Sequence, residues 1–274
     1  MRICGRDVRR IGYGAAFRVA GRPATATCLG DRGAAHRILR RAVELGADLL
    51  DTADSYGPAL SEELVAEALR PYPPDLLIAT KGGVVRTDRD RTRFDGRPDR
   101  LRAACEASLR RLGLDAIPLY QLHWADPAVP FADQVGALAD LRTTGKIRHL
   151  GLCNIGVAEL EAALAIAPVA SVQCRYGPGE RDRDALIDAC TRAGIPFIAY
   201  GPLAALQDPR RRCVLRGIAD RLGATPAQVA LAWVLQRAPN SFAIPGTLNP
   251  VHLAENMEAA RLRLPDDDWA RLAA

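Results

Sequence analysis

Lysine is nearly absent from this chain, although the chain is basic. The sequence has 37 lysine and arginine residues against 32 aspartate and glutamate residues, and only Lys81 and Lys146 are lysines. An ammonium group is a compact point charge whose pKa shifts readily, whereas a guanidinium group stays charged in proteins. Each of the two lysines is therefore a candidate for chemistry that arginine cannot supply.

Long apolar runs and metal-binding motifs are also missing. No run of roughly 18 apolar residues exists that could cross a membrane, and residues 1–7 lack the apolar centre of a signal peptide. We therefore expect a cytoplasmic protein with no membrane partner. The seven cysteines and four histidines show no CxxC or other metal-ligand spacing, so we expect free thiols and no metal.

The positive charge is not gathered into one block. The net charge of +5 is spread along the chain, and the few aromatic residues do not alternate with the basic ones. Proteins that bind nucleic acids usually concentrate basic residues on one face or helix. We therefore expect no nucleic-acid partner.

The length and composition are those of a globular protein with one large core. The chain has 274 residues, 49% of them apolar and 25% charged, with a mean hydropathy of −0.05. A (β/α)8 barrel typically has about 250 residues. We expect a single domain over residues 1–274, as a monomer or a weak homo-oligomer.

Apolar strand-like runs alternate with amphipathic, helix-like stretches. Eight runs are predicted as strands: Arg10–Gly14, Ala47–Asp51, Leu76–Thr80, Ile117–Gln121, His149–Leu152, Ser171–Gln173, Phe197–Tyr200 and Phe242–Ile244. Glycine commonly ends a helix because it adopts the left-handed backbone conformation without a Cβ penalty, and five such stops occur, at Gly46, Gly113, Gly145, Gly194 and Gly223. Eight alternating βα units predict an α/β fold, a (β/α)8 TIM barrel.

An open, doubly wound sheet is the alternative architecture. It would normally carry GxGxxG after its first strand, where the glycines let the backbone approach a dinucleotide. The first predicted strand offers only Gly12 and Gly14, without the third glycine. The pattern therefore favours the barrel.

Polar residues follow three neighbouring predicted strands. The second strand ends in Asp51, and the chain then runs through a loop to Tyr56. The third strand is followed by Lys81, and the fourth by His123. In a barrel of parallel strands, the carboxyl ends of all strands meet at one rim, where catalytic groups lie. We therefore expect an acid, a phenol, an amine and an imidazole to lie together.

The ordered motifs resemble those of the aldo-keto reductase family. They are Asp-Thr-Ala-x-x-Tyr-Gly from Asp51, Thr-Lys at Lys81, Leu-His-Trp around His123, then Gly151-Leu-Cys-Asn, Gln173, Tyr200-Gly-Pro-Leu, Ile244-Pro-Gly-Thr and Glu255-Asn. The opening Arg10–Ala15 and the segment Ile244–Thr247 look most like the bacterial branch that includes pyridoxal reductases. The resemblance covers nearly the whole chain.

The resemblance implies reduction of an aldehyde or ketone to an alcohol by hydride transfer from NADPH. Asp51, Tyr56, Lys81 and His123 would form the catalytic tetrad, with Tyr56 as the proton donor. A free phenol has a pKa of about 10 and is a reluctant acid, so we expect the ammonium group of Lys81 to lower the pKa of Tyr56. His123 would orient the carbonyl, and Trp124 would form an apolar wall for the substrate.

The resemblance also implies a cofactor site along the rim. Asn154 and Gln173, with Cys153 where serine is usual, would hold the nicotinamide carboxamide, and Tyr200 would stack on the ring. The other expected contacts run from the pyrophosphate to the adenine: Gly201, Pro202, Leu203, Gly246, Thr247, His252, Glu255 and Asn256. Gly246 and His252 replace the lysine and arginine that usually grip the 2′-phosphate. We therefore expect NADPH to be preferred, with weaker use of NADH.

Two other functions fit the same barrel. A non-catalytic, cofactor-sensing subunit would share the fold, because fold alone does not fix function. A sugar isomerase would need a cluster of metal-binding acids and histidines at the rim, and the sequence shows none. The mixed-charge segment Arg86–Arg97 is typical of a solvated loop, with a role in gripping an anionic substrate as the second interpretation.

Overall fold

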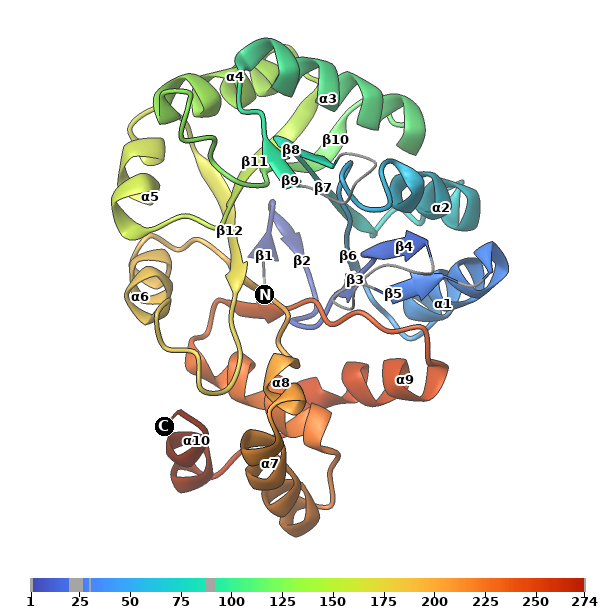
Figure 1. The fold of residues 1–274 in the computed structure, drawn as a ribbon, viewed down its shortest axis with the longest axis vertical. Helices are drawn as coiled ribbons and strands as arrows, with labels where there is room; N and C mark the ends of the chain where they lie inside the picture. The colour runs from blue at the N-terminus through green and yellow to red at the C-terminus, as the bar shows by residue number, and fades with distance from the viewer. Residues whose placement is uncertain (1, 20–26, 30, 87–91, 274) are drawn as a thin grey trace.

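Eight parallel strands form the centre of the molecule. The computed structural model describes residues 2–19, 27–29, 31–86 and 92–273. Within them the sheet runs in the order β14-β13-β12-β11-β10-β7-β6-β3, with most helices in a ring around it (Figure 1). The strands are β3 (Tyr13–Gly14), β6 (Leu49–Asp51), β7 (Leu77–Gly82), β10 (Ile117–Leu122), β11 (Ile147–Cys153), β12 (Val169–Arg175), β13 (Phe197–Tyr200) and β14 (Ser241–Ala243).

The sheet closes on itself. Ile11, just before β3, forms a parallel bridge with Ala243 of β14, and the backbone N–H of Gly12 donates to the carbonyl of Ala243 over 2.9 Å. Closure leaves no unpaired edge strand. The predicted (β/α)8 barrel is therefore confirmed, and each of its eight strands overlaps a predicted one.

The helices follow the strands along the chain. They are α1 (Arg32–Glu44), α2 (Leu60–Leu69), α3 (Pro98–Leu112), α4 (Phe131–Thr143), α5 (Val157–Leu164), α6 (Asp184–Arg192), α7 (Pro209–Leu222), α8 (Pro226–Arg237), α9 (Pro250–Glu258) and α10 (Asp266–Ala273). All five glycines predicted as helix stops have a positive φ. No helix in the described part of the chain is long and apolar enough to span a membrane.

The barrel interior is apolar towards the amino-terminal ends of the strands and polar at their carboxyl ends. Leu49, Leu77 and Leu119 belong to one buried cluster inside the barrel. Side chains two positions apart on a strand point to the same side, so Asp51 and Gln121 continue this inward row one layer higher. The polar layer therefore lies at the carboxyl ends of the strands.

Two hairpins were not predicted. The first joins β1 (Arg2–Ile3) and β2 (Arg6–Asp7), and its neighbours Ile3 and Val8 belong to the interior cluster, so it covers the amino-terminal end of the barrel (Figure 1). The second joins β8 (Val84–Arg86) to β9 (Thr92–Phe94). The segment interpreted as a solvated loop is thus partly a hairpin, although residues 87–91, with Arg89 and Arg91, lie outside the described residues.

Candidate active site

A buried ion pair lies at the centre of the polar layer. Asp51 ends β6 and Lys81 lies in the neighbouring strand β7, with 3% and 0% of their surfaces exposed. The ammonium group of Lys81 donates to Oδ2 of Asp51 and, over 2.8 Å, to the carbonyl of Thr52. Burial lowers the pKa of Lys81, but Asp51, together with Tyr56 and Cys153, raises it more, so the amine stays charged.

The second carboxylate oxygen of Asp51 accepts from two glutamine amides. Nε2 of Gln173 lies 2.8 Å from Oδ1 of Asp51, and Nε2 of Gln121 lies 3.2 Å from it. The side chain of Gln173, expected at the nicotinamide, is therefore also part of the Asp51 network. Gln121 was missed, although its inward position two residues after Leu119 was a usable signal.

Tyr56 lies over the ion pair. Its hydroxyl is 3.5 Å from Nζ of Lys81, and the same Nζ lies 5.0 Å from the centroid of its ring. The loop that carries it is fixed by the backbone N–H of Asp54, which donates to the carbonyl of Lys81 over 3.2 Å. Four residues beyond Tyr56, this loop becomes α2.

The expected direction of the pKa shift of Tyr56 is wrong. Burial raises the pKa of Tyr56, and although Lys81 lowers it, the net pKa lies above its ordinary value. The reason is that desolvation of the phenolate outweighs the nearby positive charge, which Asp51 already compensates in part. Tyr56 is therefore a protonated phenol at neutral pH.

The ring of His123 packs against the ring of Tyr56. The two rings meet edge to face, with centroids 5.7 Å apart and planes at 83°. Burial, with the positive charges of Lys81 and Arg86, holds the pKa of His123 well below its usual value. Oγ of Ser55 lies 3.4 Å from Nδ1 of this neutral imidazole. All four expected tetrad residues thus lie together.

The residues expected to hold the nicotinamide follow β11 and β13. Asn154, directly after Cys153, has a left-handed backbone with φ of 56°, and its Nδ2 donates to the carbonyl of His123 over 3.0 Å. The hydroxyl of Tyr200 donates to Oδ1 of Asn154 over 2.9 Å. The sulfur of Cys153 is directed at Gln121, 3.6 Å from its Oε1. This side of the rim is therefore linked to the Asp51 network.

The residues expected at the nucleotide end lie around the start of α9. Thr247 accepts at Oγ1 from the backbone N–H of Asn249 over 3.1 Å, and Asn249 caps the helix. Gly246 and His252 are exposed, and Glu255 is partly buried. Oδ1 of Asn256 is buried without a hydrogen-bond partner. A buried amide lacking a partner and an exposed helix N-terminus fit an adenine and a phosphate. Gly201, Pro202 and Leu203 follow β13 directly along the chain.

Trp124, expected as a wall of the substrate site, is 38% exposed. Its ring stacks on Phe94 of β9, with centroids 5.7 Å apart and planes at 22°. The hairpin of β8 and β9 thus borders the rim beside His123.

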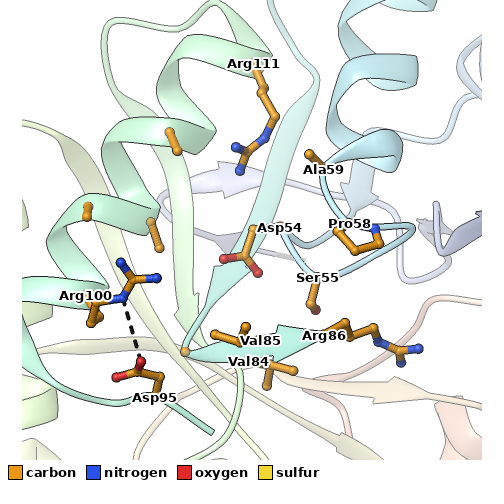
Figure 2. A pocket seen from close by; sticks show the side chains of 14 residues that line it. Asp54, Ser55, Pro58, Ala59, Val84, Val85, Arg86, Asp95, Arg100 and Arg111 are labelled. Carbon is orange, nitrogen blue, oxygen red and sulfur yellow. Dashed lines mark ion pairs between the residues drawn. The ribbon is translucent and has the colours of Figure 1, made fainter. Parts of the chain in front are cut away.

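A separate cavity of about 380 Å³ lies beside the loop that carries Tyr56 (Figure 2). Its lining comes from the loop of Asp54 and Ser55, from β8, and from α3, and includes none of Tyr56, Lys81 and His123. Burial and the charge of Glu62 raise the pKa of Asp54 to about 8, and its Oδ1 has no hydrogen-bond partner. The cavity is therefore distinct from the rim that carries the tetrad.

Lys146, the other lysine, is remote from this chemistry. It precedes β11 at the opposite end of the barrel, is partly exposed, and pairs with Glu106 over 3.0 Å. Within the described ranges, no three acidic, histidine or cysteine side chains are grouped to hold a metal ion. Lys81 is thus the lysine that lies at the site.

Comparison with known proteins agrees with this geometry. The model of the Aldo/keto reductase family matches residues 30–274. The chain belongs to the aldo/keto reductase family. The family and fold predicted from the motifs are therefore confirmed.

Individual members of the family match most of the chain. Pyridoxine 4-dehydrogenase of Escherichia coli is 38% identical over 268 residues, which cover 96% of this chain and 93% of that protein. An uncharacterized oxidoreductase of Schizosaccharomyces pombe is 41% identical over 242 residues, 88% of this chain and 79% of that protein. The crystal structure of an aldo/keto reductase from Klebsiella pneumoniae with NADP and acetate has a TM-score of 0.80 and 28% identity, and covers 97% of this chain and 90% of that one. The first of these matches agrees with the bacterial branch that the motifs suggest.

Proposed function

We propose that this chain reduces an aldehyde or ketone to an alcohol with NADPH, and that Tyr56 gives the proton. The observation that carries the proposal is the Tyr56 hydroxyl 3.5 Å from an ammonium group that a buried carboxylate holds in place. A carbonyl that accepts a hydride becomes an alkoxide and needs a proton at neutral pH. A protonated phenol beside a fixed positive charge meets that need.

The residues at the rim fit a nicotinamide dinucleotide. When bound, NADPH would supply the hydride that adds to the carbonyl carbon. Asn154 and Tyr200 would hold the nicotinamide end, and the N-terminus of α9 with Asn256 would hold the adenosine end. The Klebsiella relative, solved with NADP, supports this choice.

Tyr56 transfers its proton to the carbonyl oxygen as the hydride adds to the carbon. The electron pair of the broken C=O π bond stays on oxygen and takes the proton, which leaves a phenolate. The ammonium group of Lys81 stabilises that phenolate. Asp51, held by the amides of Gln121 and Gln173, keeps Lys81 directed at Tyr56, and a proton from solvent then restores the phenol.

His123 orients the carbonyl. A neutral imidazole carries one N–H. We assign that hydrogen to Nε2, where it can bond the carbonyl oxygen, with the Ser55 hydroxyl as the donor to Nδ1. The oxygen is then held by two donors, Tyr56 and His123.

Oxidation of NADPH with a panel of carbonyl compounds tests the activity. The panel includes pyridoxal, because a relative is a pyridoxine 4-dehydrogenase, with short and aromatic aldehydes and a ketose. We expect turnover of at least one aldehyde, with the alcohol formed in equal amount to the NADPH consumed. Absence of turnover across the panel, with NADPH bound, would favour a cofactor-sensing subunit.

Dissociation constants of NADPH and NADH test which of the two cofactors the protein prefers. We expect tighter binding of NADPH, from the N-terminus of α9 and the Thr247 hydroxyl. The margin should be smaller than two charge-assisted contacts would give, each worth roughly 1.5–3 kcal/mol, because Gly246 and His252 supply no fixed positive charge. Tighter binding of NADH would overturn this assignment.

A further inference from the structure

The cavity beside the loop that carries Tyr56 is lined by polar side chains from two sides. Asp54 and Ser55 belong to the loop, whereas Arg100 and Arg111 project from α3. Figure 2 shows the carboxyl group of Asp54 and the two guanidinium groups directed into the same space. The volume of about 380 Å³ falls within the roughly 300–1,000 Å³ of small-molecule pockets. The cavity can therefore hold a small ligand apart from the tetrad.

The carboxyl group of Asp54 is an unsatisfied polar group of this cavity. Its Oδ1 is buried and has no hydrogen-bond partner among the described residues. Arg111 does not supply one, because its guanidinium group is paired with Glu62 over 2.6 Å. Burial and the charge of Glu62 raise the pKa of Asp54 to about 8, so the carboxyl group carries a proton at neutral pH. Asp54 can therefore donate a hydrogen bond to a ligand in the cavity.

Positive charge exceeds negative charge where α3 begins. Three arginines, Arg93, Arg97 and Arg100, lie within 2.8–3.7 Å of the single carboxylate of Asp95. Arg97 is the nearest, at 2.8 Å, whereas Arg100 lies 3.7 Å away, beyond hydrogen-bond distance. Arg100 is also the one of the three that lines the cavity. Its N–H donors can therefore turn to a ligand without breaking the closest pair.

We propose that this cavity is a second binding site, which takes small organic acids with their carboxylate between Asp54 and Arg100. The O–H of Asp54 would donate to one carboxylate oxygen and the guanidinium group of Arg100 to the other, and hydrogen bonds to an ionised group are the stronger kind. The apolar side chains of β8 and α3 would meet the body of the acid. An amine fits less well, because it would lie against Arg100 and Arg111.

Calorimetry with three probes of the same shape tests the charge of the ligand. Benzoate, benzamide and benzylamine carry a negative, no and a positive charge on a similar ring, and the protein is loaded with NADP to keep them out of the cofactor site. We expect benzoate to bind, and the other two to bind at least about tenfold more weakly, as loss of one charge-assisted contact would give. Tighter binding of benzylamine, or no benzoate binding up to about 10 mM, would overturn the proposal.

Arg100→Gln and Arg93→Gln form a matched pair that locates the benzoate. Each removes one positive charge beside Asp95, but of the two only Arg100 lines the cavity. We expect benzoate to bind at least about tenfold more weakly to Arg100→Gln, and within about twofold of wild type to Arg93→Gln, since exposed charges are screened by salt. Equal losses in the two variants, or no loss in Arg100→Gln, would overturn the site.

The pH dependence of benzoate binding tests the proton of Asp54. The charged or titratable groups around Asp54 are Glu62, Lys81, Arg111 and Tyr120, and across the cavity Arg86, Asp95 and Arg100. Glu62 pairs with Arg111, the pKa of Asp95 is lowered, and those of Lys81 and Tyr120 are raised. Asp54 is therefore the group that titrates near pH 8. Above that pH its carboxylate repels benzoate, so we expect the affinity to fall about tenfold from pH 7 to pH 9.

Two substitutions of Asp54 separate its hydrogen bond from its proton. Asp54→Asn keeps an N–H donor at every pH, so benzoate should bind within about threefold of wild type at pH 7 and equally well at pH 9. Asp54→Leu removes the donor, and we expect at least about tenfold weaker binding at pH 7. Unchanged affinity in Asp54→Leu, or a fall with pH in Asp54→Asn as steep as in wild type, would overturn the role of Asp54.

Discussion

Two acidic residues, Asp51 at the end of β6 and Asp54 in the loop that follows, differ in their surroundings. Asp51 is met by the ammonium group of Lys81 and by the amides of Gln121 and Gln173. Asp54, three residues later, has a buried Oδ1 without a hydrogen-bond partner, and its pKa is raised to about 8. Arg111, whose charge lowers the pKa of Asp54, is already paired with Glu62 over 2.6 Å.

The difference shows what a buried charge needs in this barrel. Removing a charge from water costs several kcal/mol unless partners replace the lost hydration. At Asp51 a cation and two amide donors replace the lost hydration, so the ionised carboxylate can hold Lys81 in place. At Asp54 the group keeps its proton instead.

Substitution of Lys81 by methionine should have the largest effect. It removes the cation beside Tyr56 and leaves Asp51 buried without its ion-pair partner. We expect kcat/KM to fall by about 1,000-fold or more, and the free energy of unfolding to fall by roughly 3–5 kcal/mol.

Lys146→Met is the control for the loss of a lysine. Lys146 pairs with Glu106 in a partly exposed place, so the loss should be about 0–1 kcal/mol with normal activity. Similar stability losses in the two variants, measured by urea unfolding, would show that the Asp51 pair is not special.

Substitution of Asp54 by asparagine should have the opposite effect on stability. The pKa of Asp54 is about 8 in the folded chain and about 3.9 in an unfolded one. The folded state therefore holds the proton more tightly, so this group lowers stability as pH rises from about 4 to about 8. Asparagine removes that loss, and we expect Asp54→Asn to be more stable by roughly 1–3 kcal/mol at pH 8.

At pH 4 the advantage of Asp54→Asn should nearly vanish, because the folded aspartic acid is then protonated and the unfolded one is still about half protonated. Urea unfolding at the two pH values measures the difference. A gain of equal size at both would mean that Asp54 does not carry a shifted proton.

The pH dependence of carbonyl reduction should be the smallest effect. Burial raises the pKa of Tyr56, so the donor keeps its proton up to at least about pH 9, and the depressed pKa of His123 keeps its imidazole neutral down to about pH 6. We expect kcat for reduction to change less than about threefold over this range. A clear inflection of kcat between these values would show that one of the two groups titrates there.

The sequence predicted the elements that carry the site better than the geometry within it. Eight strands and the residues at their ends were visible because apolar runs and glycine stops mark them locally. The two hairpins were not, since their short strands mix arginine with apolar residues and form no apolar run. The raised pKa of Tyr56 was missed because it depends on how deeply the ring is buried, which only packing decides.

The roles of the partners of Asp51 could be predicted only in part. Gln173 was identified through its motif, but its hydrogen bond to Asp51 connects β12 with β6, which are remote in sequence. Gln121 belongs to no quoted motif, and only its inward register on β10 marks it. The cofactor contacts and Trp124 remain predictions until a complex is studied.

A single-turnover measurement of hydride transfer in Tyr56→Phe shows whether Tyr56 gives the proton to the carbonyl oxygen. The variant keeps the ring but removes the hydroxyl 3.5 Å from Lys81, and rapid mixing of its NADPH complex with the best aldehyde isolates the chemical step from product release. We expect a rate at least about 100-fold below wild type, with the dissociation constant of NADPH changed less than about threefold. A near-normal rate of hydride transfer would contradict it.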